Sequence, residues 1–205
     1  MVAKKIKEII IVGSSSNMAQ SFTKNYKDKY SFLNISRKKK YNLKYLLNKN
    51  LKKDNDYSAI IYFIGNFRRS VEITQNDLKI NFLYLKKVLE YNYKSYLKKK
   101  RHIKFIAITS LDATFPNTNS VGYSTMKSAS SHLILNYQKL HKKTKISYFD
   151  IQPGAVKTKM RKKKTGNALK VEEISKTIEY ILSLSSEVSM LPIRIFPKLN
   201  SYLIY

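Results

Sequence analysis

Two kinds of apolar segment alternate along this chain. Short continuous apolar runs, each typical of a strand buried on both faces, occupy residues 7–13, 30–36, 59–65, 105–108 and 146–151. Longer segments whose apolar residues recur every three or four positions predict helices over 75–97, 123–141 and 171–184. No internal repeat or linker interrupts this alternation. It predicts an α/β fold of one domain, 1–205, built on a Rossmann-like, doubly wound, mainly parallel sheet with helices on both faces.

The segment 110–127 contains the clearest candidates for catalytic residues. Ser110 follows the strand at 105–108, turn-forming residues come next, and Tyr123 opens a helix that also holds Lys127. Tyr123 and Lys127 share one helical face, where an ammonium lowers the pKa of a phenol and makes it a better proton donor. A hydroxyl at the strand end could hold a substrate oxygen opposite that phenol. The alternative is a surface Tyr–Lys pair beside a Ser that caps the strand.

This order of Ser, twelve residues, Tyr, three residues and Lys resembles the active site of the short-chain dehydrogenase/reductase family. The resemblance implies hydride transfer between a nicotinamide cofactor and a carbonyl or alcohol. Tyr123 would be the general acid or base, Lys127 would lower its pKa and bind the cofactor ribose, and Ser110 would hold the substrate oxygen. Asn81, inside the helix at 75–97, stands where the family carries an Asn that positions a water of the proton relay.

The turn after the first strand is a candidate phosphate site. A strand, a tight turn and a helix N-terminus together present backbone N–H groups and a helix dipole to an anion. The family's loop has three glycines, of which this chain keeps the first. Asn17 stands at the second position and tolerates a left-handed backbone, and Ala19 at the third permits close packing. The expected cofactor contacts here are Gly13, Ser15, Ser16, Asn17 and Met18.

The end of the second strand bears on which cofactor is used. The resemblance places this end at the adenosine ribose, where Arg or Lys favours the 2′-phosphate of NADP over the free hydroxyl of NAD. Arg37, followed by Lys38, therefore predicts NADP(H) rather than NAD(H), although a solvated lysine cluster is the alternative. Only about twenty residues then separate Arg37 from the strand at 59–65, too few for the helix, strand and helix that the family places there, so no adenine contact is assigned.

Two further glycine turns match the family in order and position. Gly65 ends the strand at 59–65 and would let the backbone approach the cofactor ribose. The turn after the strand at 146–151 resembles the family's segment that holds the nicotinamide carboxamide, which implies contacts from Pro153, Gly154, Val156 and Thr158. The basic segment 159–170 occupies the place of a substrate lid. Arg68 and Arg69 border the expected substrate pocket or belong to a solvated loop.

A formal charge of +27 is the most unusual feature of the composition. Such a charge favours nucleic acid, an anionic membrane surface or a polyanionic substrate. The lysine clusters lie mostly at expected loops and helix ends, however, and the chain is also rich in Asn, Ile and Tyr, which share AT-rich codons with Lys. We therefore expect no nucleic-acid partner. The charge still favours anionic ligands, and a phosphorylated or sugar-derived carbonyl or alcohol is the expected small-molecule substrate.

The remaining composition narrows the class of protein. The chain has no Cys and three scattered His, so neither a disulfide framework nor a metal site is expected. No apolar run approaches the roughly 18 residues of a membrane span, and the N-terminal apolar run is too short for a signal peptide. A cytoplasmic protein is expected, and the apolar tail at 200–205 is compatible with a homodimer or homotetramer.

In one alternative interpretation, the protein has this fold but no catalytic activity. The incomplete glycine loop and the short segment at 38–58 are compatible with a catalytically idle protein of this fold that binds a nucleotide, a protein or a polyanion. Retention of Asn81, Ser110, Tyr123 and Lys127 together favours the enzyme, because an idle site need not keep all four.

Overall fold

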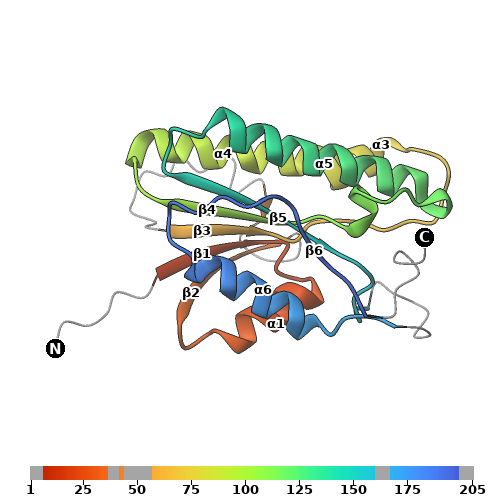
Figure 1. Ribbon diagram of the computed structural model, residues 1–205, viewed down its shortest axis with the longest axis horizontal. Coiled ribbons are helices and arrows are strands. Elements are labelled where there is room, and N and C mark those ends of the chain that lie inside the picture. The colour runs from red at the N-terminus through yellow and green to blue at the C-terminus, as the bar shows by residue number, and fades with distance from the viewer. Residues whose placement is uncertain (1–6, 37–41, 44–56, 160–166, 199–205) are drawn as a thin grey trace.

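A six-stranded parallel sheet forms the centre of the computed structural model, which describes residues 7–36, 42–43, 57–159 and 167–198 (Figure 1). The strand order is β2-β1-β3-β4-β5-β6, and every neighbouring pair is parallel. The strands are β1 (Lys7–Val12), β2 (Tyr30–Ile35), β3 (Tyr57–Tyr62), β4 (Ile103–Ile108), β5 (Ile146–Pro153) and β6 (Ile193–Ile195). The predicted doubly wound parallel sheet is confirmed.

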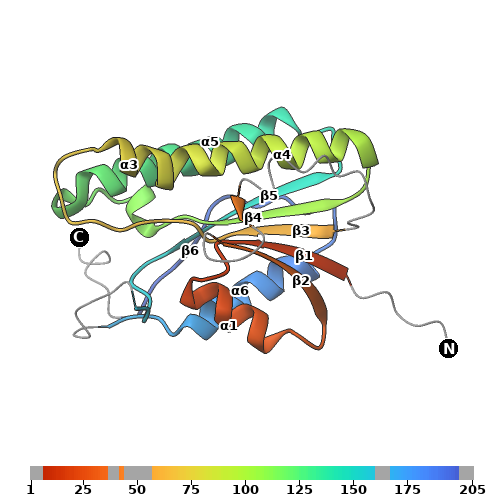
Figure 2. The same ribbon diagram turned by 180° about the vertical axis from the view of Figure 1, so that it is seen from behind.

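Helices cover both faces of this sheet, as the two opposite views show (Figures 1 and 2). One face carries α3 (Gln75–Leu78), the π-helix η1 (Lys79–Leu83), α4 (Tyr84–Lys99) and α5 (Val121–Leu140). The other face carries α1 (Asn17–Asn25) and α6 (Val171–Ser183). Two single 3-10 turns, η2 (Leu111–Ala113) and η3 (Thr118–Ser120), connect β4 to α5.

The strands read as continuous apolar runs because each supplies two hydrophobic cores. Successive side chains of a strand point to opposite faces. In β1, Ile10 and Val12 belong to the core under α4 and α5, whereas Ile9 and Ile11 belong to the core over α1 and α6. All four side chains are fully buried. Both cores thus fix the strands, and with them the chain segments that leave the strands' carboxyl ends.

The structure changes some of the predicted boundaries. The strand predicted at 59–65 is β3, which begins and ends earlier, so that Gly65 lies in the segment after it. The helix predicted over 75–97 forms, but η1 interrupts it with one turn of π-helix, in which the Tyr84 N–H bonds to the Lys79 carbonyl. The predicted structure between Arg37 and β3 lies outside the described residues, apart from Asn42 and Leu43.

A buried histidine lies in an aromatic cluster at the end of α5. His141 is 4% exposed, its Nδ1 lies 2.7 Å from the Tyr148 hydroxyl, and its ring stacks on Tyr93 at 4.0 Å between centroids. Tyr137 contacts the same ring edge-on. Burial lowers the pKa of His141, because the imidazolium would lose its hydration in this cluster.

We expect this histidine to make stability depend on pH. Above about pH 6.5, the usual histidine pKa, His141 is neutral in both the folded and the unfolded chain. Below it the unfolded chain takes up a proton that the folded chain resists, so the free energy of unfolding falls by at most about 1.4 kcal/mol per pH unit. Urea unfolding at neutral and mildly acidic pH measures this loss.

His141→Gln should be less stable at neutral pH but should lose less stability on acidification. The matched control is His102→Gln, because His102 is exposed. It should keep the pH dependence of the wild-type protein. An unchanged acid-induced loss in His141→Gln would contradict this role of His141.

Candidate active site

The chain makes a close turn immediately after β1. The N–H groups of Gly13 and Ser14 both donate to the Ile35 carbonyl of β2, at 2.9 and 3.1 Å. Gly13 has a φ of +88°, and a Cβ at this residue would lie 3.0 Å from the backbone nitrogen of Ile64. Only glycine accommodates both the positive φ and the close approach of the Ile64 backbone. This explains why the chain has a glycine at the first position of the expected phosphate loop.

Helix α1 begins directly behind that turn. Ser16 is its N-cap, and the Ser16 Oγ accepts a hydrogen bond from the Ala19 N–H at 3.1 Å. Ser15 is exposed, and Ser16 and Met18 are half-buried. The Ser14 hydroxyl is buried and has no hydrogen-bond partner among the described residues. The N-terminus of a nine-residue helix therefore faces the turn, with its remaining N–H groups directed toward any anion bound there.

Asn17 makes a contact that its position in the loop did not predict. The left-handed backbone expected at the second glycine position is wrong, because Asn17 is the first residue of α1 and Lys100 is the only described non-glycine residue with positive φ. The Asn17 Oδ1 instead accepts a hydrogen bond from the Lys159 N–H at 3.0 Å. The side chain thus joins the start of α1 to the segment that follows β5, 142 residues later.

Tyr123 and Lys127 lie on the first turns of α5. Lys127 is 3% exposed, and its Nζ lies 5.6 Å from the centre of the Tyr123 ring. The half-buried Tyr123 ring packs edge-on against Phe67, with 5.1 Å between centroids. Burial lowers the pKa of Lys127 to about 8, and the negative charge of Asp150 opposes this shift. At pH 7 the side chain is still mostly an ammonium, and it adjoins the phenol.

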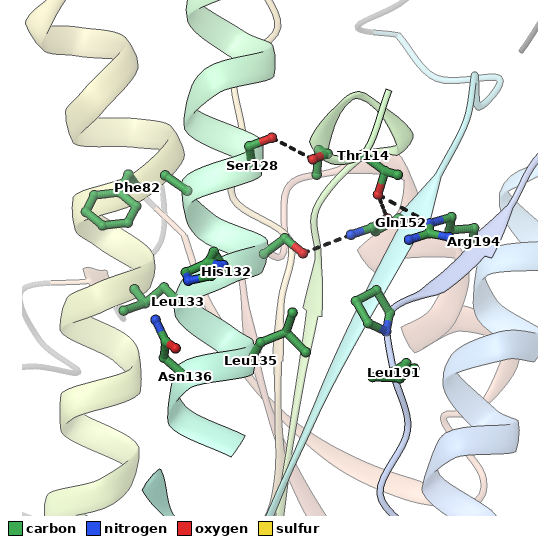
Figure 3. Close-up of a pocket in the computed structure, with 14 residues that line it drawn as sticks. Phe82, Thr114, Ser128, His132, Leu133, Leu135, Asn136, Gln152, Leu191 and Arg194 are labelled. Atoms are coloured by element: carbon green, nitrogen blue, oxygen red, sulfur yellow. Dashed lines mark hydrogen bonds between the residues drawn. The ribbon is translucent and has the colours of Figure 1, made fainter. Parts of the chain in front are cut away.

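Ser110 lies where β4 ends and is fixed by the turn η2. It is 9% exposed, and its Oγ accepts a hydrogen bond from the Asp112 N–H at 3.2 Å. Two serines of α5 hold η2 in place: Ser124 donates to the Asp112 carbonyl at 2.8 Å and Ser128 to the Ala113 carbonyl at 2.5 Å. In Figure 3, Ser128 points from its helix toward the loop of Thr114. The turn that carries Ser110 is therefore anchored to the helix that carries Tyr123.

Asn81 lies in the π-helix, 1% exposed, and closes the loop that follows β3. Its Oδ1 accepts from the Asn66 N–H at 2.8 Å, and its Nδ2 donates to the Asn66 carbonyl at 3.0 Å. Its own carbonyl accepts a hydrogen bond from the Ser130 hydroxyl of α5 at 2.7 Å. A Cβ on Gly65 would lie 3.0 Å from Lys127 Nζ and 3.6 Å from Asn81 Oδ1. Asn81, Gly65 and Lys127 therefore form one contact group.

In the segment after β5, one backbone edge has no hydrogen-bond partner among the described residues. The N–H of Gly154 donates to the Ile195 carbonyl of β6 at 2.8 Å. The Lys157 N–H bonds to the Leu169 carbonyl, and the Leu169 N–H bonds to the Ala155 carbonyl, which makes a parallel bridge around Val156. In such a bridge the N–H and C=O of Val156 itself point to the opposite edge. Thr158 is half-buried beside this edge.

Some residues that the sequence analysis assigned to the site are not in contact with Asn81, Gly65 and Lys127 among the described residues. Arg37 lies outside the described residues, as does most of the expected lid, 160–166. The Arg68 guanidinium donates to the Glu72 carbonyl at 3.2 Å and to the Asp77 carboxylate at 3.3 Å, so it holds its own loop together. Arg69 is exposed.

The expected site residues lie along one edge of the sheet. Gly13, Gly65, Ser110 and Pro153 lie at or just beyond the carboxyl ends of β1, β3, β4 and β5, where ligands bind in open parallel sheets. In the described part of the chain, no three His, Cys, Asp or Glu side chains come together as metal ligands. None of the described helices has the length and apolarity of a membrane span.

Sequence reasoning missed two features of the site. Nothing in the hydrophobic period distinguishes η1 from the α-helix around it, although π-turns are frequent at functional sites. The second feature is Asp150, a buried acid in strand β5, which the sequence analysis did not single out.

Comparisons with known proteins bear on one segment of the sequence and on the fold. The family profile described as short chain dehydrogenase matches residues 71–168, a segment that contains Asn81, Ser110, Tyr123 and Lys127. No curated protein matches the chain in sequence.

Many solved structures share the fold. A short-chain type dehydrogenase/reductase from Mycobacterium ulcerans is similar with a TM-score of 0.80 and 14% identity, over 93% of this chain and 88% of that chain. A short chain dehydrogenase from Burkholderia cenocepacia, solved with NADP, gives 0.79 and 12%, over 93% and 88%. Serine dehydrogenase from Escherichia coli gives 0.78 and 15%, over 95% and 100%. At these identities the structures show the shared fold. The part of the chain from 71 to 168 is thus similar to the short-chain dehydrogenases, and the described residues share the fold of these enzymes.

Proposed function

We propose that the protein is an NAD(P)-dependent oxidoreductase that interconverts a carbonyl and an alcohol, with Tyr123 as general acid and base. The observation that carries this proposal is the buried Lys127 ammonium beside the Tyr123 ring, in contact with the Gly65–Asn81 group. A buried ammonium next to a phenol is costly as a structural feature but useful for proton transfer.

The residues present fit a dinucleotide. The Gly13 turn and the N-terminus of α1 offer N–H groups to a pyrophosphate, through the backbone of 13–18. Tyr123 and Lys127 would bind the nicotinamide ribose, and Gly65 leaves the room that this needs. The open backbone edge of Val156 and the Thr158 hydroxyl suit a carboxamide. A bound nicotinamide supplies or accepts the hydride. Two structures that share the fold were solved with NADP and NADH.

The protein's own residues would handle the proton. In the direction of reduction, Tyr123 donates its hydroxyl proton to the substrate oxygen, because the adjacent Lys127 ammonium stabilises the phenolate that remains. The Ser110 Oγ is already fixed as an acceptor by the Asp112 N–H, so its O–H can be directed to the substrate oxygen. Asn81 would position a water through which Lys127 passes a proton.

We further propose that the cofactor is NADP(H) and that the substrate is anionic. Arg37 and the lysines after it suit a 2′-phosphate. The formal charge of +27 would attract anionic ligands generally, so a phosphorylated or sugar-derived carbonyl fits best. A catalytically idle cofactor-binding protein is the competing possibility that the following measurements address.

The first measurement is a titration of the protein with NADPH and with NADH, followed by cofactor fluorescence. We expect NADPH to bind more tightly. Arg37→Ala should weaken NADPH binding by tenfold or more, as expected when a charge-assisted hydrogen bond of about 1.5–3 kcal/mol is lost, and should change NADH binding little.

Arg69→Ala is the matched control, because it removes the same charge from an exposed position. It should change NADPH binding little. Equal effects of the two substitutions would show that only overall charge matters. If neither cofactor binds at millimolar concentration, the oxidoreductase proposal is wrong.

The second measurement tests Tyr123. In a screen of carbonyl substrates with NADPH, Tyr123→Phe should lower turnover by about 10²–10⁴-fold, the usual contribution of a general acid, while cofactor binding persists. The matched control is Tyr180→Phe on α6, where Tyr180 is 56% exposed. Wild-type turnover in Tyr123→Phe would exclude the proton-donor role.

A further inference from the structure

We propose that a cleft between α5 and the segment that leads into β6 binds a small monocarboxylate with an apolar chain, and that Arg194 pairs with its carboxylate. The cleft has a volume of about 1090 Å³, close to the upper end of small-molecule sites, roughly 1,000 Å³. Ser110, Tyr123 and Lys127 do not line it, so it is separate from the candidate active site. The proposal goes beyond the proposed oxidoreductase activity and does not depend on it.

The cleft exists because β6 extends the sheet beyond the helices of this face. β6 is the edge strand, and its Ile193 and Ile195 pack against the core of α1 and α6. Successive side chains of a strand alternate, so Arg194 lies on the opposite face, which carries α5. Gln152 of β5 follows the core residue Ile151 in the same way. On this face no helix of the described chain follows α5 toward β6, and Arg194 and Gln152 therefore line a cleft beside α5 (Figures 1 and 3).

At its polar end, the cleft holds a guanidinium whose direction is fixed. The Arg194 Nε donates hydrogen bonds to the Thr114 hydroxyl at 3.2 Å and to the Gln152 Oε1 at 3.3 Å. The Thr114 hydroxyl donates to the same Oε1 at 2.7 Å, and Figure 3 shows these three side chains together. Gln152 is 1% exposed, and its amide nitrogen donates to the Ser131 hydroxyl at 2.9 Å and to the Asp150 carboxylate at 3.0 Å. Because arginine only donates, the amide oxygen must face Arg194, and the buried amide orients the guanidinium.

The outer part of this guanidinium is available to a ligand. The side chain of Arg194 is exposed, and its two Nη groups donate to no acceptor among the described residues. Parallel N–H groups of a guanidinium match the two oxygens of a carboxylate in a bidentate pair. Among the described residues that line the cleft, Arg194 is the only Lys or Arg, and there is no Asp or Glu. One positive charge favours a carboxylate over a doubly charged phosphate.

The other part of the cleft is apolar. Leu135 of α5 and Leu191 lie on opposite sides of it in Figure 3. Leu191 is 79% exposed, which leaves apolar surface for a ligand to cover. Gln138 of α5 donates to the Met190 carbonyl at 3.1 Å, so the two walls are joined at this end. A ligand whose carboxylate pairs with Arg194 can therefore lay an apolar chain between the two leucines.

The direct test is a titration of the ¹⁵N-labelled protein with decanoate, below the concentration at which decanoate forms micelles, followed by amide NMR shifts. We expect one saturable site, with shifts at Leu135, Leu191 and Arg194. Arg194→Gln should weaken binding tenfold or more, because a bidentate charge-assisted contact is lost.

Lys139→Gln is the matched control for charge. It removes the same charge from an exposed position of α5 that does not line the cleft, and it should change decanoate binding little. Equal weakening by Lys139→Gln and Arg194→Gln would show that decanoate responds only to the overall positive charge. That result would overturn the proposal, as would the lack of any binding at millimolar decanoate.

A second arm tests the apolar wall with exposed residues whose replacement leaves the core intact. Wild-type affinity should rise from butyrate to decanoate, because the longer chain covers more apolar surface. Leu191→Ser should remove most of this difference, whereas Leu140→Ser, which changes a leucine that is 74% exposed outside the cleft, should keep it. Equal affinities of butyrate and decanoate for the wild-type protein would contradict an amphipathic site.

Two further results would assign the binding or the cleft differently. Decanoate shifts confined to the turn 13–18 and to Tyr123 would place the ligand in the candidate active site and refute the proposal. A dimer in sedimentation that Leu191→Asp converts to a monomer, without decanoate binding, would make the cleft an interface between two copies of the chain.

NADP⁺ separates this proposal from the proposed function. Saturating NADP⁺ should not displace decanoate, because the two sites share no residue. If the protein binds no nicotinamide cofactor, the oxidoreductase proposal fails, and the Arg194→Gln titration still decides whether the cleft binds a carboxylate.

Discussion

The ammonium of Lys127 is a buried charge, and the arrangement of the site follows from how the fold accommodates it. Removing an ammonium from water costs several kcal/mol unless other groups compensate. Here the compensation comes from the Tyr123 ring beside the Nζ and from the attraction of Asp150, which opposes the fall in pKa that burial causes. Gly65, whose missing Cβ makes room, and the π-turn that carries Asn81 border the same atom.

The two cores of the sheet make this arrangement possible. Because β4 and β5 are held on both faces, Thr109 and Asp150 meet at 2.5 Å although they are 41 residues apart. The serines of α5 extend this rigidity. Ser124 holds η2, Ser130 holds η1, and Ser131 holds β5. The helix is thus fixed to three neighbours by short polar contacts, and Tyr123 and Lys127 take their positions from it.

How far the sequence predicts the structure depends on how local each signal is. The parallel strands and the long helices followed from apolar runs and from a period of three to four residues, and Ser110, Tyr123 and Lys127 from fixed spacing along one strand end and one helix. Contacts between distant segments could not be read in this way. The hydrogen bonds of Asn17 to Lys159, and of Thr109 and Ser131 to Asp150, join residues that the fold brings together from distant parts of the chain. The apolar period of the sequence did not mark the π-turn at Lys79–Leu83.

The central claim is that the edge of the sheet around Lys127 is a dinucleotide site in which this ammonium meets the nicotinamide ribose. A crystal structure of the protein grown with NADP⁺ tests it most directly. The account predicts the pyrophosphate at the turn 13–17, the ribose in contact with Tyr123 and Lys127, and the carboxamide at Val156. A dinucleotide bound elsewhere, or one bound at this edge without contact to Lys127, would contradict it.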